Sequence, residues 1–172
     1  MKKLLFVALL LSGCATPALT PLKSNYEKPY MVEINRPFDD VWSDVVDVLA
    51  TKGLNIKTLD KSSGIVISEK VSFVGSITVE DANGILKDPK AYVVTSWNRN
   101  ELNMIITPNQ AFGTWNVRVK KLSDSVTVVS ANIVGLEAVL SQTSLANTPI
   151  LATFEAKSTG VFEKSFLELI KE

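Results

Sequence analysis

The chain has 172 residues, in which 18 Lys and Arg balance 18 Asp and Glu, with one cysteine and no histidine. This length suits one domain with a hydrophobic core of its own. The even charge, without a basic stripe, argues against nucleic acid as a partner. The lack of histidine excludes Ser-His and Cys-His catalytic pairs and histidine-based metal sites.

Residues 1–13 have the pattern of an export signal. Lys2 and Lys3 are followed by an uninterrupted apolar run, Leu4–Leu11, and then by small residues ahead of Cys14. Eight helical residues span roughly 12 Å, far less than the ~30 Å hydrocarbon core of a bilayer. We therefore expect a signal peptide that is removed on export and does not span the membrane.

The junction Leu11-Ser12-Gly13-Cys14 resembles the processing site of bacterial lipoproteins. In that family the cysteine thiol is joined to diacylglycerol, the signal is cut before the cysteine, and the new amino group is acylated. The resemblance implies that Cys14 is the lipid attachment site and that fatty acyl chains such as palmitate anchor the protein. A plain secretory signal with an incidental cysteine is the alternative. Cys14 is the sole cysteine, so no disulfide can form within the chain.

The residue after Cys14 bears on which membrane is used. In Gram-negative lipoproteins an aspartate at this position tends to retain the protein at the inner membrane. Ala15 therefore implies the outer membrane of the cell envelope, with the domain facing the periplasm, in preference to the inner membrane or a Gram-positive cell membrane. Several acyl chains hold a protein stably on a membrane, whereas one chain gives only marginal binding.

Residues 14–29 contain Pro17, Pro21 and Pro29 among small and polar residues, without an apolar period. This composition predicts a flexible tether between the lipid and the body. Fully extended, it reaches at most roughly 50 Å. We expect residues 30–172 to form one folded domain.

The best-defined element is a helix that begins near residue 38. A short strand, Tyr30–Ile34, precedes it, Pro37 suits its first turn, and Gly53 suits a left-handed cap at its end. Apolar residues fall on one helical stripe, which predicts a buried face. The stripe consists of Phe38, Val41, Trp42, Val45, Val46 and Leu49.

Strands are predicted for most of the remaining chain from alternating apolar residues and intervening turns. One hairpin joins Leu54–Leu59 to Ile65–Ser68 through the turn Asp60–Gly64, and a second joins Trp115–Lys120 to Val126–Val134. Further strands are expected at Val71–Val79, Tyr92–Trp97, Leu102–Thr107 and Ile150–Phe154, with a loop at Pro108–Gly113.

A second helix closes the chain after Ser158, with Thr159 or Gly160 as its cap. Its expected apolar stripe is Val161, Phe162, Phe166, Leu169 and Ile170, and its charged residues Glu163, Lys164, Glu168 and Lys171 are expected to face out. The order of strand, helix, several strands and helix predicts an α+β domain with both helices on one face of the sheet.

Three segments, 36–69, 115–133 and 158–170, together resemble the helix-grip domain of BamC-like outer-membrane lipoproteins. In that family an N-terminal and a C-terminal helix grip one face of a twisted antiparallel sheet. BamC carries two such domains behind a long unstructured segment, whereas one domain and a short tether are expected here. The resemblance implies a non-enzymatic accessory that binds another envelope protein.

Residues with possible chemistry form no convincing catalytic or metal site. Asp40, Asp44 and Asp47 share one helical edge that can attract a hard cation, but a solvated face is the favoured interpretation. Asp60–Gly64 has too few carboxylates for a metal loop. No partner is evident for Glu69, Glu80 or Asp81, so the chain is predicted to use no cofactor and no metal, and not to be an enzyme.

Aromatic residues give a weaker signal for a partner surface. Trp42 is expected in the core, whereas Trp97, Trp115 and Phe112 within Ala111–Gly113 either pack on the core or mark a contact surface.

Two functions are therefore compared. The first is a lipid-anchored module that binds another envelope protein, and the second is a carrier that holds a small apolar ligand between helix and sheet. A packed interior beneath the first helix would count against the carrier.

Overall fold

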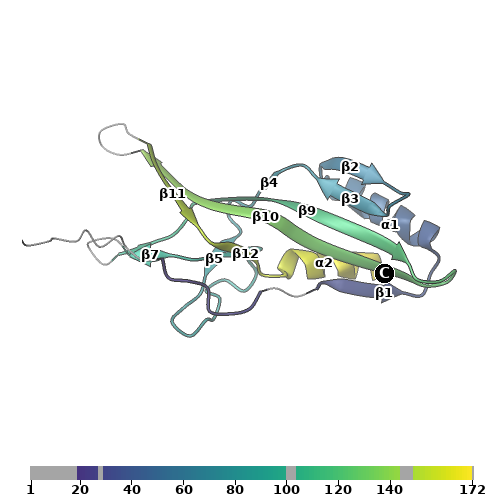
Figure 1. The fold of residues 1–172 in the computed structure, drawn as a ribbon, viewed down its shortest axis with the longest axis horizontal. Coiled ribbons are helices and arrows are strands. Elements are labelled where there is room, and N and C mark those ends of the chain that lie inside the picture. The colour runs from purple at the N-terminus through teal and green to yellow at the C-terminus, as the bar shows by residue number, and fades with distance from the viewer. Residues whose placement is uncertain (1–18, 27–28, 100–103, 144–148, 172) are drawn as a thin grey trace, which may run out of the picture.

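Two long antiparallel strands, β9 (Gln110–Lys121) and β10 (Thr127–Thr143), run along the length of the molecule (Figure 1). The computed structural model describes residues 19–26, 29–99, 104–143 and 149–171. Strand β10 is rich in Val, Thr and Ala, and alternate residues of β9 are buried, as expected for a sheet that is covered on one face.

Short strands pair with both outer edges of this central hairpin. One edge carries β1 (Met31–Ile34) and β11 (Pro149–Phe154), which both pair with β10. The other carries β3 (Ile65–Ser68) and β4 (Val71–Ser72), which pair with β9, while β2 (Ile56–Asp60) pairs with β3. The result is a seven-stranded, wholly antiparallel sheet.

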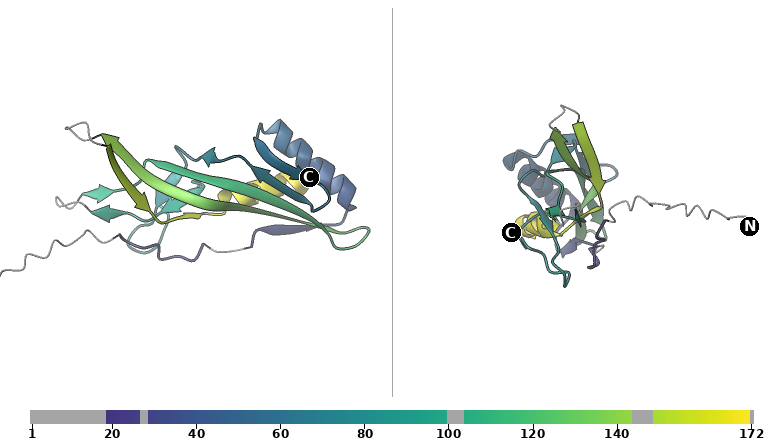
Figure 2. Two further views of the ribbon diagram at one scale, coloured as in Figure 1. Left: turned by 45° about the horizontal axis from the view of Figure 1, so that its top comes forward. Right: turned by 90° about the vertical axis from the view of Figure 1, so that its left-hand side faces the viewer.

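Two smaller sheets lie toward one end of the molecule. The first has the order β12 (Ala156–Ser158), β6 (Val93–Thr95), β5 (Ile77–Val79), with β5 and β6 parallel. The second is a pair, β7 (Asn98–Arg99) and β8 (Ile105–Ile106). Leu19 and Thr20, where the described chain starts, lie at this end beside β7, and β1 and the tip of the β9–β10 hairpin lie at the opposite end (Figure 2).

Both helices pack against the large sheet. Helix α1 (Phe38–Thr51) contacts β9, and α2 (Val161–Lys171) contacts β10, β1 and α1. Val41, Val45 and Leu49 of α1 are completely buried in the same core as Phe166 and Ile170 of α2. The described elements, two helices with a large antiparallel sheet and two smaller sheets, agree with the predicted α+β class.

Most predicted elements are confirmed. The first helix has the predicted bounds and stripe, and Gly53 adopts the expected left-handed conformation with a φ of 62°. The hairpin through Asp60–Gly64 is present as β2 and β3, and the Asp60 side chain accepts hydrogen bonds from Ser62 and Ser63 in the turn. The predicted strand Val126–Val134 lies within β10, and its alternate residues Thr127, Val129, Ala131 and Ile133 are buried on one face.

Several boundaries were predicted wrongly. Residues 110–113 belong to β9 and are not a loop, because residues 110–112 pair with β10 and residues 112–113 pair with β4. Residues 71–79 form two strands in different sheets, β4 and β5. On α2, Glu163 and Leu167 are buried and Leu169 is exposed, so the predicted stripe and the outward position of Glu163 were wrong.

Candidate functional site

The large sheet has an outer face, opposite the helices, that carries an apolar groove flanked by cations. Register places Met31, Ser130 and Arg118 side by side on neighbouring strands, and Val128 beside Lys120. With Leu122, these six residues line a groove of about 310 Å³, and we call it the outer groove. Met31 is 58% exposed and Leu122 51% exposed, so the groove presents apolar surface to solvent beside its two cations.

The cations of the outer groove have no anionic partner within the part of the chain that the structure describes. Lys121 pairs with Asp124 at 2.6 Å and Lys61 pairs with Asp39 at 2.7 Å, but no such pair involves Arg118 or Lys120. Two unpaired positive charges beside exposed apolar side chains suit an anionic and partly apolar ligand surface.

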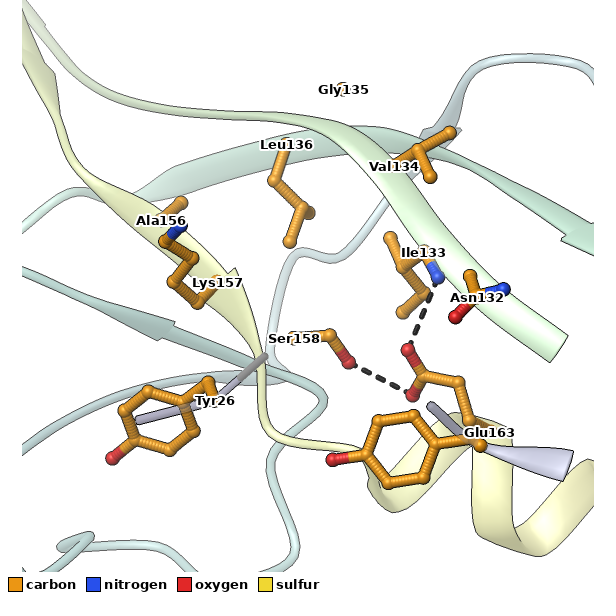
Figure 3. A pocket seen from close by; sticks show the side chains of 11 residues that line it. Tyr26, Asn132, Ile133, Val134, Gly135, Leu136, Ala156, Lys157, Ser158 and Glu163 are labelled. Carbon is orange, nitrogen blue, oxygen red and sulfur yellow. Dashed lines mark hydrogen bonds between the residues drawn. The ribbon is translucent and has the colours of Figure 1, made fainter. Parts of the chain in front are cut away.

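A second cleft, of about 370 Å³, lies where the edge of β10 is left uncovered (Figure 3). Strand β1 pairs with β10 as far as Ser130, and strand β11 starts to pair with β10 at Ala138. Between these points β10 bulges around Gly135, and residues 132–136 line the cleft together with Tyr26, Tyr30 and Glu163. We call it the edge cleft.

Glu163 links α2 to this uncovered edge. Its side chain is 1% exposed, and its two carboxylate oxygens accept hydrogen bonds from Ile133 N–H at 3.1 Å and from the Ser158 hydroxyl at 2.8 Å (Figure 3). Burial raises the pKa of the Tyr30 hydroxyl above its ordinary value, and the nearby charge of Glu163 raises it further. Because both oxygens are used in holding the fold, Glu163 acts as a structural link between helix and strand.

Glu80 holds the segment that precedes the domain. The carboxylate is 4% exposed and accepts hydrogen bonds from Lys23 N–H at 2.6 Å, Ser24 N–H at 3.0 Å and the Tyr26 hydroxyl at 2.7 Å. Burial raises the pKa of Glu80, but these hydrogen bonds outweigh it, so the pKa lies below its ordinary value. In turn, burial and the bond to Glu80 raise the pKa of Tyr26 to about 12.

Residues 20–26, which we call the strap, therefore lie against the domain, although they belong to the tether predicted over 14–29. Thr20 N–H also donates to the carbonyl of Trp97 at 2.6 Å, and the Ser24 hydroxyl donates to the carbonyl of Gly84 at 3.0 Å. This contact and the partners of Glu80 were not predictable from the sequence, since the bonded residues lie more than 50 positions apart.

The other residues singled out from the sequence are dispersed. Cys14 lies outside the described residues. Asp44 pairs with Arg36 at 2.5 Å, Glu69 is exposed, and Asp81 accepts turn hydrogen bonds from Asn83 and Ile85. Among the described residues, no cluster of acidic side chains or cysteines is suited to hold a metal ion.

The tryptophans separate into core and surface. Trp42 and Trp115 are buried, at 6% and 1% exposure. Trp97 is half-buried near the start of β7, with the Arg99 guanidinium 5.3 Å from its ring centre. Phe112 lies on β9 beneath the Lys70 ammonium group. Trp97 is therefore the tryptophan that remains available at a surface.

Comparison with protein-family models and with curated proteins found no match to this chain. Within the described residues, no helix is both long and apolar enough to cross a membrane.

Proposed function

We propose that the protein is a lipid-anchored module of the bacterial cell envelope that binds another protein and has no enzymatic activity. The anchor is Cys14, within the Leu11–Cys14 processing site, and Ala15 favours the outer membrane with the domain facing the periplasm. The domain is proposed to be a helix-grip fold. In support, an N-terminal and a C-terminal helix contact the same antiparallel sheet, as in the BamC-like proteins that the chain resembles.

The outer groove is the proposed binding site. The observation that carries this proposal is that exposed Met31 and Leu122 line the same groove as two cations, Arg118 and Lys120, that form no ion pair within the described residues. Apolar contacts supply affinity, whereas charges on the rim steer the encounter and select the partner. The expected partner surface therefore combines apolar side chains with carboxylates.

In-cell photocrosslinking tests the groove. A crosslinking amino acid at Leu122 is expected to give a discrete adduct with another envelope protein, and the adduct is expected to disappear in the Arg118→Glu, Lys120→Glu double variant. Leu169 of α2 is a matched control, because it is an exposed leucine on another element, 38% exposed. Equal adducts from Leu122 and Leu169, or an adduct that survives the charge reversal, would contradict the proposal.

The anchor is tested separately by Cys14→Ser and cell fractionation. The unaltered protein is expected to stay with the membrane after a carbonate wash, and the variant is expected to appear in the soluble fraction. A variant that remains with the membrane would show that lipid at Cys14 does not hold the protein there.

A carrier of a small apolar ligand is the second candidate, and the edge cleft is the observation that favours it. Its volume of about 370 Å³ lies within the range of small-molecule sites, and Ile133 and Leu136 supply apolar lining. Against it, Val41, Val45 and Leu49 beneath the first helix are completely buried, so that part of the interior is packed. Native mass spectrometry that shows a co-purified lipid, lost in Leu136→Glu, would favour the carrier.

A further inference from the structure

The end of the molecule that holds the strap carries a group of exposed apolar side chains. Leu19 is 45% exposed, and Met104 and Ile105, at the start of β8, are 55% and 45% exposed. Trp97 and Arg99 belong to the same end, because Arg99 pairs with Ile105 and Trp97 is bridged to Thr20. We call this set of five residues the strap end.

The covalent chain limits how far the strap end can be from a lipid on Cys14. Thr20 is fixed to Trp97 by a backbone hydrogen bond of 2.6 Å, so free chain can begin only before this point. The five residue steps from Cys14 to Leu19 span at most roughly 18 Å in any conformation. The free part of the predicted tether is thus shorter than roughly 50 Å. A lipid on Cys14 would keep Leu19, and with it the strap end, within roughly 18 Å of the anchored residue.

We propose that the strap end rests on the membrane that holds the lipid anchor and thereby orients the domain. Large apolar side chains gain free energy by leaving water for the boundary between lipid headgroups and acyl chains. Tryptophan prefers the level of the lipid headgroups because its ring is apolar and its N–H is polar. The Arg99 guanidinium lies 5.3 Å from the centre of the Trp97 ring, so a cation accompanies this indole at the strap end.

This orientation leaves the outer groove accessible. The strap end lies at one end of the elongated molecule, and the tip of the β9–β10 hairpin, beside Leu122, lies at the other (Figures 1 and 2). A domain that rests on the strap end therefore presents Met31 and Leu122 away from the bilayer, toward partners in the periplasm. The inference rests on the proposed lipid anchor at Cys14.

Depth-dependent fluorescence quenching tests the orientation. The probe is an environment-sensitive fluorophore on Ile105→Cys in the full-length lipidated protein, bound to vesicles of phosphatidylethanolamine and phosphatidylglycerol that contain spin-labelled lipid. We expect loss of fluorescence at position 105 and none at the matched control, Leu122→Cys, which is a similarly exposed apolar residue at the opposite end. Met104→Glu is expected to reduce the quenching at position 105 while the protein remains bound to the vesicles.

The outcomes separate the two proposals. Protein that stays on the vesicles but shows no quenching at 105, or equal quenching at 105 and 122, overturns the orientation and leaves the lipid anchor intact. Protein that does not bind the vesicles at all overturns both the lipid anchor and the orientation, since neither the lipid nor the strap end then holds the protein on a membrane. Circular dichroism of each labelled protein establishes that the fold is retained.

Discussion

Single residues at the start of α2 fix the helix to the rest of the domain. Gly160 has a φ of +84°, and a Cβ atom there would overlap the ring and hydroxyl of Tyr30. Only glycine meets both demands without strain, since other residues rarely adopt this conformation. Tyr30 leads directly into β1, so this close contact sets the distance between the first strand and the last helix.

Gly160→Ala is predicted to destabilise the protein strongly. The left-handed backbone costs about 1–2 kcal/mol for alanine, and displacement of Tyr30 adds about 1–3 kcal/mol. Gly53→Ala is the matched control, because Gly53 has a φ of +62° but no atom within 4 Å of the added Cβ. Urea denaturation of the soluble Cys14→Ser protein measures both variants. Equal losses of stability would contradict the role assigned to Tyr30.

Glu163→Gln is predicted to destabilise the domain by about 1–3 kcal/mol. Both carboxylate oxygens accept hydrogen bonds, and in glutamine one of them is replaced by an NH₂ group that cannot accept, so one donor loses its partner. The two donors are Ile133 N–H and the Ser158 hydroxyl. Glu168→Gln, on the exposed side of the same helix, removes an ion pair with Lys171 and is expected to change stability by less than about 0.5 kcal/mol. Thermal unfolding of both variants would contradict the structural role of Glu163 if their midpoints were the same.

At the scale of elements, the Glu80 carboxylate accepts three of the hydrogen bonds that hold the strap, so docking of the strap should depend on pH. The pKa of docked Glu80 lies below its ordinary value of 4.5, so the charged form stabilises docking. The stabilisation is complete above the ordinary pKa and is lost as pH falls through the pKa of the docked state. Acid is therefore expected to release residues 20–26 while the core stays folded.

Hydrogen exchange at the amides of Lys23 and Ser24, corrected for intrinsic rates, measures this release. Protection is expected to be high at about pH 6 and to fall toward about pH 3. In Glu80→Gln the protection is expected to be low at both values, because a neutral amide is a weaker acceptor for three donors. If acid lowers the protection of these amides equally in the unaltered protein and in Glu80→Gln, a titrating group other than Glu80 controls docking of the strap.

Elements with a strong local period were predictable, and elements defined by distant partners were not. Helix α1 has six apolar residues on one stripe and a proline and a glycine at its ends, so local chemistry specifies it. In contrast, Gly113 was predicted to end a loop, but it lies within β9 because β4 pairs with it. The side chains of Leu136, Phe73 and Ile133 leave little room there for a Cβ atom. These contacts come from residues 20 to 40 positions away and leave no local pattern.

The candidate site follows the same division. Met31, Arg118 and Lys120 lie on predicted strands, and strand alternation alone places each on one face, but their adjacency depends on the register between β1, β10 and β9. Glu80 and Glu163 were misinterpreted for a related reason. A buried carboxylate needs donors around it. The three donors of Glu80 lie more than 50 positions away, and one of the two donors of Glu163, the Ile133 N–H, lies 30 positions away.

At the scale of the whole molecule, the small β5–β6–β12 sheet is joined to the main core by packing as well as by chain. Tyr92 packs edge-on against Phe162 of α2, with ring centres 5.9 Å apart, and Val93 belongs to the same buried cluster as Val41 of α1. Thr159 N–H donates to the carbonyl of Tyr92 at 3.0 Å, at the junction between β12 and α2. Loss of either sheet therefore removes packing from the other.

The described domain is accordingly predicted to unfold in one cooperative step, as a single domain over residues 30–172 requires. In the Cys14→Ser, Trp97→Phe protein, Trp42 and Trp115 report on the main core, and a fluorophore on Lys90→Cys, an exposed position beside β6, reports on the small sheet. Urea titration is expected to give the same midpoint and the same slope for both probes. If the label at position 90 changes at a lower urea concentration, the small sheet is a separate unit and the strap, held by Glu80 beside β5, unfolds with it.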